Sequence, residues 1–356
     1  MSIAFVFPGQ GAQTIGMGQA LAEAYPAARA VFDEVDEALG QDLSGLIWTG
    51  EIEALTLTEN AQPALMATSM AALAALKAEG VSLENAAFVA GHSLGEYSAL
   101  CAAGALSLAD TARLLRVRGR AMQAAVPVGQ GAMAAVLGLD AAAVDKVAQE
   151  AAGDDVCQLA NENDPTQNVI SGSKAAIERA VVLAKEAGAK RALPLPVSAP
   201  FHCALMQPAA DEMAKALADV TMQAPGVPLV ANVLAEAVSD ADRIRDLLVE
   251  QVTGRVRWRS SVEWMAAQGV TEFWEIGAGK ALSGMIRRIA KESTCRAVGT
   301  PDDVVAVVAA CCGSSLLWQW WRACCGGGGG RAGHGPGFCH CHRQSRPDHS
   351  HALWTR

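Results

Sequence analysis

Positive charge is in short supply in this chain of 356 residues, since 28 lysines and arginines face 37 aspartates and glutamates, a formal net charge of −9. A negative balance argues against a general nucleic-acid-binding protein, and we expect no nucleic-acid partner. The start also lacks the basic residues and long apolar stretch of a secretory signal, because Pro8-Gly9 ends the first apolar run. An uncharged stretch at 304–321 is interrupted by glycine, serine and glutamine, so we predict no membrane span.

Cysteine and histidine are scarce through residue 310, which holds only four cysteines and two histidines. The cysteines are scattered and form no Cys-x-x-Cys pair; they are Cys101, Cys157, Cys203 and Cys295. This pattern is typical of reduced, buried thiols in a cytosolic protein, and we expect a cytoplasmic location. The two histidines, His92 and His202, are the candidates for any imidazole chemistry.

The composition changes at residue 311. Residues 311–356 hold six cysteines, five histidines, four tryptophans and a run of five glycines. Codons rich in G and C encode such a mixture when read out of frame, and we predict that this segment is disordered or the product of a shifted reading frame. Its Cys-His-Cys-His cluster at 339–342 is spaced too tightly for one tetrahedral zinc site, so we expect no metal.

Apolar residues make up 51% of the chain, which is the composition of a globular protein with a large core. Apolar runs of strand length alternate with helical patterns at both ends of the main part of the chain. The expected strands are 3–7, 86–90, 227–233 and 272–276, and the expected helices include 18–39, 62–79 and 204–218. This alternation predicts an α/β fold, with a mostly parallel sheet covered by helices on both faces.

The order of the expected strands and helices differs between residues 128 and 197. The expected order there is strand 131–139, helix 141–152, strands 156–161 and 168–172, helix 174–188 and strand 191–197. A βαββαβ order is that of a ferredoxin-like unit. We therefore predict a catalytic domain made of residues 1–127 and 198–310, with a ferredoxin-like subdomain, 128–197, inserted into it.

The most informative motif is GHSLG at residues 91–95, which lies between an expected strand and an expected helix. Gly-x-Ser-x-Gly in this context is the nucleophile elbow of α/β-hydrolases, so the larger domain is predicted to be α/β-hydrolase-like. The turn is so tight that only glycine fits two residues before and two after the serine. It lifts the Ser93 hydroxyl above the sheet, at a helix N-terminus where developing negative charge is stabilised.

A serine nucleophile needs a general base. His92 is adjacent to Ser93 in sequence, and neighbouring side chains on a tight turn point apart. His202 follows an expected strand and lies downstream of the serine, as the histidine does in α/β-hydrolases, so it is the better candidate. A buried structural histidine is the alternative at this position. Cys203 is a weaker nucleophile candidate, because no electropositive pocket is evident around it.

Four arginines crowd one expected helix, and a solvated face is the usual explanation of such a run. They are Arg113, Arg116, Arg118 and Arg120. Arg118 differs, since it is followed by Gly119 and lies among apolar residues. An arginine fixed near the serine would hold a carboxylate of the substrate in a two-pronged contact.

Five motifs in this order resemble malonyl-CoA:acyl carrier protein transacylases, and the resemblance spans residues 2 to about 308. They are GQGAQ (9–13), GHSLGE (91–96), RVRGRAM (116–122), PFH (200–202) and GAGK (277–280). The resemblance implies transfer of a malonyl group from malonyl-CoA to the phosphopantetheine thiol of acyl carrier protein, in fatty acid biosynthesis. It implies that Ser93 carries the malonyl ester, that His202 is the base and that Arg118 holds the malonyl carboxylate.

The same resemblance implies further site residues. Gln10 and Leu94 would donate backbone amides to the oxyanion, and Gln251 would help to orient the histidine, where many enzymes use a buried acid. Asn161 matches an asparagine near the cleft, with no clear chemical role. The reaction needs no metal or redox cofactor, and we expect a monomer.

Other functions remain open from the sequence alone. A serine esterase or thioesterase would have the same elbow and histidine. An acyltransferase for another acyl group, as in polyketide or malonate decarboxylase systems, is a further alternative, although Phe201 before the histidine resembles the malonyl-type pattern.

Overall fold

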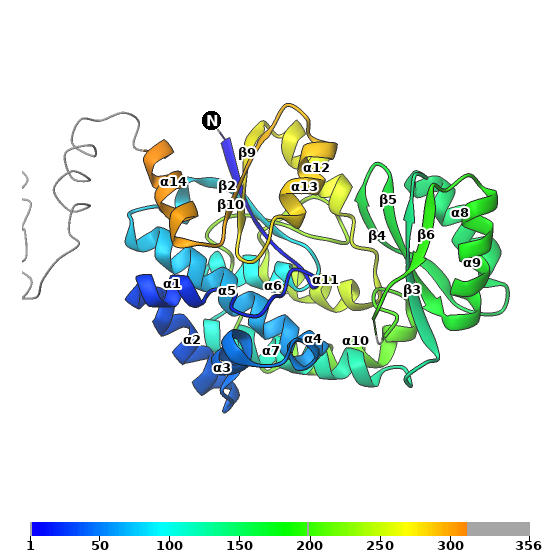
Figure 1. Cartoon of the computed structure of the whole chain (residues 1–356), viewed down its shortest axis with the longest axis horizontal. Helices are drawn as coiled ribbons and strands as arrows, with labels where there is room; N and C mark the ends of the chain where they lie inside the picture. The colour runs from blue at the N-terminus through cyan, green and yellow to red at the C-terminus, as the bar shows by residue number, and fades with distance from the viewer. Residues whose placement is uncertain (1, 198, 312–356) are drawn as a thin grey trace, which may run out of the picture. The chain divides into compact units, whose positions relative to one another are not determined.

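The computed structural model describes residues 2–197 and 199–311, and these residues form two β-sheets (Figure 1). The larger sheet has the strand order β10-β9-β1-β2-β7-β8, and all neighbours are parallel except β7 and β8. Its strands are β1 (Ser2–Phe7), β2 (Ala86–Gly91), β7 (Leu229–Val230), β8 (Ala237–Val238), β9 (Val270–Ile276) and β10 (Thr294–Val298). With helices packed against it, this sheet confirms the predicted α/β class.

The centre of the larger sheet is apolar on both faces. In β1, Ala4 and Val6 point into one core cluster, whereas Phe5 and Phe7 point into another. Phe5 stacks on Trp274 of β9 with 5.1 Å between the ring centroids. A parallel strand covered on both faces needs a continuous apolar run, which is why these strands could be identified from the sequence.

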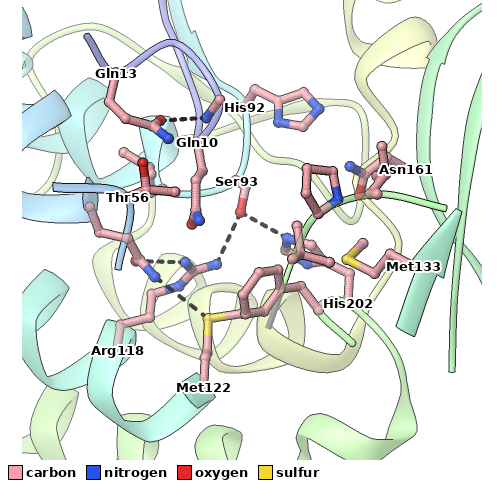
Figure 2. Close-up of a pocket in the computed structure, with 17 residues that line it drawn as sticks. Gln10, Gln13, Thr56, His92, Ser93, Arg118, Met122, Met133, Asn161 and His202 are labelled. Atoms are coloured by element: carbon pink, nitrogen blue, oxygen red, sulfur yellow. Dashed lines mark hydrogen bonds between the residues drawn. The ribbon is translucent and has the colours of Figure 1, made fainter. Parts of the chain in front are cut away.

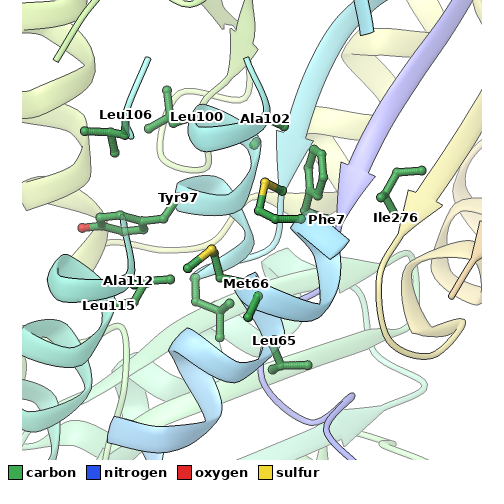
Figure 3. Packing of buried hydrophobic residues seen from close by; sticks show 14 of the residues in the cluster. Phe7, Leu65, Met66, Tyr97, Leu100, Ala102, Leu106, Ala112, Leu115 and Ile276 are labelled. Carbon is green, nitrogen blue, oxygen red and sulfur yellow. The ribbon is translucent and has the colours of Figure 1, made fainter. Parts of the chain in front are cut away.

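The six-stranded sheet and the helices around it are here called the large lobe. Its helices are α1 (Gln19–Ala24), α2 (Pro26–Leu39), α3 (Leu43–Thr49), α4 (Ile52–Thr56), α5 (Thr58–Ala78), α6 (Gly95–Ala102), α7 (Leu108–Ala124), α10 (Gln207–Ala218), α11 (Ala241–Thr253), α12 (Trp258–Ala267), α13 (Ala281–Ile289) and α14 (Pro301–Cys311). Two 3₁₀ turns, Leu83–Asn85 and Ala204–Met206, complete the lobe. Helix α5 is buried along most of its length, and its Leu65 and Met66 share a core cluster with Phe7 and Tyr97 (Figure 3). A helix that is apolar all round belongs in such an interior.

Several predicted helices have different bounds in the structure. The helix predicted at 204–218 begins as a 3₁₀ turn and is α-helical from Gln207, and the helix predicted at 174–188 ends at Glu186. The pattern at 18–39 splits into α1 and α2 at Pro26, which has no N–H for a helical hydrogen bond and disfavours a helical conformation at the residue before it. That residue, Tyr25, is extended, with φ −128°. Pro26 instead takes the first position of α2, where its missing N–H costs nothing. The helix predicted at 62–79 starts earlier, at Thr58, so Pro63 lies inside α5 and not in its first turn.

The second sheet, here called the small lobe, is antiparallel with the order β4-β5-β3-β6. Its elements are β3 (Gly131–Leu137), α8 (Ala141–Ala152), β4 (Cys157–Asp164), β5 (Gln167–Ser173), α9 (Lys174–Glu186) and β6 (Arg191–Pro194). Both helices lie on the same side of the sheet (Figure 1). This is the predicted βαββαβ arrangement, although β6 ends at Pro194, before the expected Val197. Prolines at 194 and 196 have no N–H to extend the ladder.

Strand β4 joins the two lobes along one edge. The Val256 amide donates to Ala160 O at 2.8 Å, and the Glu162 amide donates to Val256 O at 2.9 Å. Beyond this bridge, Arg288 of α13 pairs with the buried Asp164 at 2.6 Å. These contacts hold the end of β4 beside the carboxyl ends of the parallel strands, where α/β proteins usually bind their ligands.

Within the described ranges, no helix is both long and apolar enough to cross a membrane. The predicted segment 311–356 lies outside the described residues, apart from Cys311 at the end of α14.

Candidate active site

The elbow between β2 and α6 has the predicted geometry. Ser93 has a φ of 53°, which few residues other than glycine adopt. A Cβ atom on Gly91 would overlap the backbone of Gly95, and a Cβ atom on Gly95 would overlap the Phe7 carbonyl. Glycine is therefore required at both positions, and the strained turn presents the Ser93 side chain at the top of the sheet.

His202 faces the serine. Its Nε2 lies 2.8 Å from Ser93 Oγ, and its Nδ1 lies 2.9 Å from the Gln251 carbonyl oxygen. Because a carbonyl oxygen only accepts, Nδ1 carries the proton and Nε2 presents its lone pair to the hydroxyl. Burial, and next the charge of Arg118, lower the pKa of His202 to about 3, so the ring is neutral at ordinary pH. A neutral imidazole in this tautomer is able to accept the Ser93 proton.

His92 has a different role from His202. Its Nε2 lies 2.8 Å from Asn163 Oδ1, and its ring packs 5.9 Å from the Trp258 ring. Burial lowers the pKa of His92 as well. Cys203 is also turned away from the serine, since its Sγ lies 3.1 Å from the Pro200 carbonyl and burial raises its pKa. Both side chains contact partners other than the serine, which supports the preference for His202 as the base and for Ser93 as the nucleophile.

Arg118 is 1% exposed, so it is not part of a solvated face. Its Nη1 donates to Gln62 Oε1 at 2.8 Å, and its Nη2 donates to Ser93 Oγ at 3.2 Å and to Gln251 Oε1 at 2.8 Å. Its guanidinium also lies 5.6 Å from the centre of the Tyr97 ring. A guanidinium keeps its charge even when burial lowers its pKa, so it places a fixed positive charge beside the serine hydroxyl.

The other arginines of α7 point elsewhere. Arg116 donates to Asn60 and Gln41 and so ties α7 to neighbouring segments, whereas Arg113 and Arg120 are exposed and pair with acidic residues. Of these four side chains, only Arg118 lines the pocket that contains Ser93.

Ser93, His202 and Arg118 open into one pocket of about 340 Å³ between the two lobes (Figure 2). The large lobe supplies one wall and the small lobe, with the segment after β6, supplies the other. The lining residues are Gln10, Gly11, Gln13, Thr56, Gln62, His92, Ser93, Leu94, Arg118, Met122, Met133, Asn161, Leu195, Pro196, Val197, Phe201 and His202. A mostly apolar cavity with a few convergent polar groups is the usual form of a small-molecule site.

Gln10 and Leu94, whose backbone amides are expected to stabilise the oxyanion, both line this pocket. Among the described residues, neither amide has an acceptor. The Gln10 side chain is fixed by Thr58, whose Oγ1 donates to Gln10 Oε1 at 2.5 Å. Two unused N–H groups beside a nucleophile are suited to stabilise an oxyanion.

Gln251 contacts the site through both its backbone and its side chain. Its carbonyl oxygen accepts from His202, as the expected orienting role requires, whereas its side-chain oxygen accepts from Arg118. Its Nε2 donates to the Ser93 carbonyl at 3.0 Å and to Glu96 Oε2 at 2.6 Å. Asn161 also lines the pocket, and its buried Oδ1 has no partner within the described part of the chain.

Sequence reasoning missed three residues of this network. Gln62 holds Arg118 from α5, Glu96 lies beneath the elbow, and Asn232 donates to Gly91 O and accepts from the Ser93 amide. Glu96 follows the elbow motif directly, so its position was a usable signal. Gln62 and Asn232 carry no motif of their own that a single sequence would reveal.

The comparisons with known proteins agree with this site. Residues 4–302 match the model of the acyl transferase domain family. The malonyl CoA-acyl carrier protein transacylase of Escherichia coli K12 is 50% identical over 298 residues, which cover 84% of this chain and 96% of that protein. The protein of the same name from Bacillus subtilis is 49% identical over 306 residues, covering 85% of this chain and 95% of that protein.

Solved structures give the same result. The acyl-carrier-protein-S-malonyltransferase of Bartonella henselae has a TM-score of 0.85 at 56% identity, covering 86% of this chain and 98% of that one. A malonyl-transacylase solved with the acyl carrier protein of a type II polyketide synthase has a TM-score of 0.84 at 42% identity, covering 86% and 99%. On the evidence of its sequence, fold and pocket, the chain belongs to the malonyl CoA-acyl carrier protein transacylase family of acyl transferases.

Proposed function

We propose that this protein transfers the malonyl group of malonyl-CoA to the phosphopantetheine thiol of acyl carrier protein, through an ester on Ser93. The observation that carries the proposal is the position of the Ser93 hydroxyl, 2.8 Å from a neutral imidazole and 3.2 Å from a buried guanidinium. The imidazole supports nucleophilic attack, and the guanidinium supports selection of an acyl group that carries a second carboxylate.

In the first half-reaction, Ser93 Oγ attacks the thioester carbon while His202 Nε2 takes its proton. The thioester oxygen becomes an oxyanion, which the Gln10 and Leu94 amides stabilise. The tetrahedral intermediate collapses, the C–S bond breaks, and the departing CoA sulfur takes the proton from His202. The malonyl carboxylate meanwhile pairs with Arg118, which fixes the acyl group and leaves its carbonyl beside the two amides.

The second half-reaction runs the same steps with the carrier protein as acceptor. His202 takes the proton of the phosphopantetheine thiol, and the sulfur attacks the malonyl-serine ester. The C–O bond breaks, and Ser93 regains its proton from His202. Both half-reactions balance without a redox partner, because only an acyl group and a proton move.

Mass spectrometry of the intact protein after incubation with malonyl-CoA tests the proposal. We expect the mass to rise by one malonyl group, and Ser93→Ala to abolish the rise without loss of the fold. Ser98→Ala is the matched control, since Ser98 is buried in α6 and lies outside the pocket lining. Malonylation of the Ser93→Ala variant would contradict the assignment of the nucleophile.

The group that accepts the acyl chain distinguishes the proposed function from two related ones. Hydrolysis of the malonyl ester without transfer to a thiol would indicate an esterase or thioesterase. The relative that was solved with a polyketide carrier protein makes such a carrier a second candidate acceptor. Comparing transfer rates to fatty-acid and polyketide carrier proteins, each loaded with phosphopantetheine, decides between them.

We also propose a cytoplasmic monomer. The free state of Cys101, Cys157, Cys203 and Cys295 supports a reducing compartment. Light scattering of the purified protein and fractionation of cells test the two parts separately.

A further inference from the structure

A cluster of buried polar side chains lies beneath the elbow, outside the pocket lining. Its members are Glu96, Asn232 and Gln251, and all three are almost fully buried. Buried polar groups are costly unless their hydrogen bonds are made, so their partners show what they hold in place.

Asn232 bridges the two sides of the strained turn. Its Oδ1 accepts from the Ser93 amide at 2.8 Å, and its Nδ2 donates to the Gly91 carbonyl at 2.7 Å. One end of the side chain faces a donor and the other an acceptor, so only one orientation of the amide fits. Asn232 therefore holds Ser93 in its positive-φ conformation, which sets the direction of the hydroxyl.

The hydrogen-bond partners of Gln251 also fix the orientation of its side-chain amide. Its Nε2 faces three acceptors, the Ser93 carbonyl at 3.0 Å, Glu96 Oε2 at 2.6 Å and, more weakly, Asn232 Oδ1 at 3.4 Å. Its Oε1 must therefore face Arg118, at 2.8 Å. A reversed amide would place an N–H group against the guanidinium and leave Glu96 facing an oxygen. The Glu96 carboxylate thus fixes the acceptor that holds the guanidinium.

Glu96 is common to both arrangements. The same Oε2 atom that accepts from Gln251 also accepts from the Asn232 backbone amide at 3.3 Å. We propose that Glu96 is a positioning residue which holds Ser93 through Asn232 and Arg118 through Gln251, and so couples the nucleophile to the group that selects the acyl chain. The inference rests on the proposed malonyl transfer, and Glu96 itself touches no substrate.

The proposal predicts two different patterns of loss in single-turnover acylation by malonyl-CoA and acetyl-CoA. Asn232→Ala removes both side-chain hydrogen bonds that hold the elbow and only the long 3.4 Å contact to Gln251, which keeps Glu96 as its acceptor. Both donors should therefore slow by a similar factor, about tenfold or more, with KM unchanged. Glu96→Met removes the shared acceptor. Both donors should slow, and malonyl-CoA should lose about tenfold more than acetyl-CoA, with a raised KM, because Arg118 is also released. Glu96→Gln keeps one oxygen at the position and should restore most of the malonyl preference.

Glu275→Met is the matched control. Glu275 is a buried carboxylate that accepts from the Leu282 and Ser283 amides and lies outside the pocket lining. It should reduce stability while leaving the malonyl-to-acetyl ratio as in the wild type. If Glu96→Met does not fold, Glu96→Asp takes its place. The aspartate side chain is one methylene shorter and does not reach Gln251, so we expect the same larger loss with malonyl-CoA than with acetyl-CoA.

A wild-type malonyl-to-acetyl ratio in Glu96→Met, or in Glu96→Asp where that variant is used, would overturn the proposal. Failure of the wild-type protein to form a malonyl adduct would instead overturn the proposed function, so the two failures are distinguishable.

Discussion

The three central polar groups of the pocket are joined in series, since hydrogen bonds pass from Arg118 to Ser93 and from Ser93 to His202. The role of Arg118 is testable because only a donor with a second carboxylate uses its charge. Arg118→Ala should weaken transition-state binding of malonyl-CoA by about 2–4 kcal/mol and that of acetyl-CoA much less. The ratio of kcat/KM for the two donors measures this difference. An equal loss with both donors would show that the arginine is only structural.

Glu96 gives a prediction about stability and pH. Burial, its largest influence, raises the pKa of this carboxyl from 4.5 to about 7. The folded state then holds a proton that the unfolded state releases, so the contribution to stability is complete below pH 4.5 and is lost as the pH rises through about 7. Glu96→Gln removes this titration. Relative to that variant, the wild type should lose up to about 3 kcal/mol of unfolding free energy between pH 4.5 and 8. Urea unfolding at several pH values checks the difference, and parallel curves for the two proteins would contradict it.

At the scale of the elements, α5 and α7 approach so closely that glycine is needed at their crossing. A Cβ atom on Gly119 would lie 2.5 Å from Glu59 Cα and 2.6 Å from the Thr58 carbonyl oxygen. Gly119→Ala should therefore destabilise the protein by about 1–3 kcal/mol, although alanine is the better helix former.

The matched control is Gly284 in α13, where the nearest atom to an added Cβ is the end of the Arg288 side chain at 3.9 Å. Gly284→Ala should be neutral or stabilise by up to about 1 kcal/mol. Thermal unfolding of the two variants should therefore shift in opposite directions, and similar losses in both would argue against the packing explanation.

The sequence predicted best those elements whose apolar pattern is continuous. The strands near 3–7 and 272–276 are buried on both faces, and the GHSLG turn permits only glycine at its ends. It predicted least well the elements whose position depends on tertiary contacts. The strand expected at 227–233 is only the two residues of β7 in the structure. Strand β8 also has two residues, too few for any periodicity, and β10 is only half-buried at the sheet edge, and neither was predicted.

The same distinction applies to the site. Ser93, His202 and Arg118 were predicted because their chemistry and neighbouring residues are distinctive. Asn232 could not be, since its importance comes from two backbone atoms of a segment far away in the sequence. Gln251 contacts His202 through its backbone carbonyl, and no pattern of side chains in the sequence encodes such a contact.

For the whole molecule, the inter-lobe ion pairs restrict where an acidic carrier protein is able to dock. Arg288 pairs with the buried Asp164 of β4, and Arg259 lies 3.9 Å from Glu162 of the same strand. Charge reversal at Arg288 would therefore leave a buried carboxylate unpaired and disturb the joint between the lobes. We choose Arg287 and Lys291 as candidate contacts for the carrier protein, because they lie close to Arg288 in the sequence and no ion pair holds them within the described residues.

Changing Arg287 and Lys291 together to glutamate should slow transfer to carrier protein in a salt-dependent manner and leave transfer to free pantetheine unchanged, because only the carrier depends on the local charge. Stopped-flow transfer assays with the two acceptors at several salt concentrations provide the measurement. Equal losses with both acceptors would exclude these residues from carrier recognition.

A second prediction for the whole molecule concerns residues 312–356, which lie beyond the 4–302 match to the family. Both sheets and every residue of the proposed mechanism belong to residues 2–311. A protein that ends at Cys311 should therefore keep its malonyl transfer rate and its melting temperature. Loss of folding on truncation would contradict the shifted-frame interpretation of this segment.

The hydrogen bonds around Ser93 join residues that are 109, 139 and 158 positions apart in the chain, at His202, Asn232 and Gln251. During synthesis on the ribosome, Ser93 is therefore made long before the residues that orient it and the histidine that is proposed to activate it. Contacts of such long range form late in folding, since the intervening loop must close first. The proposed malonylation of Ser93 would thus be a chemical reporter of completed folding, and we expect a chain released before α11 is made to carry the elbow motif yet remain unlabelled.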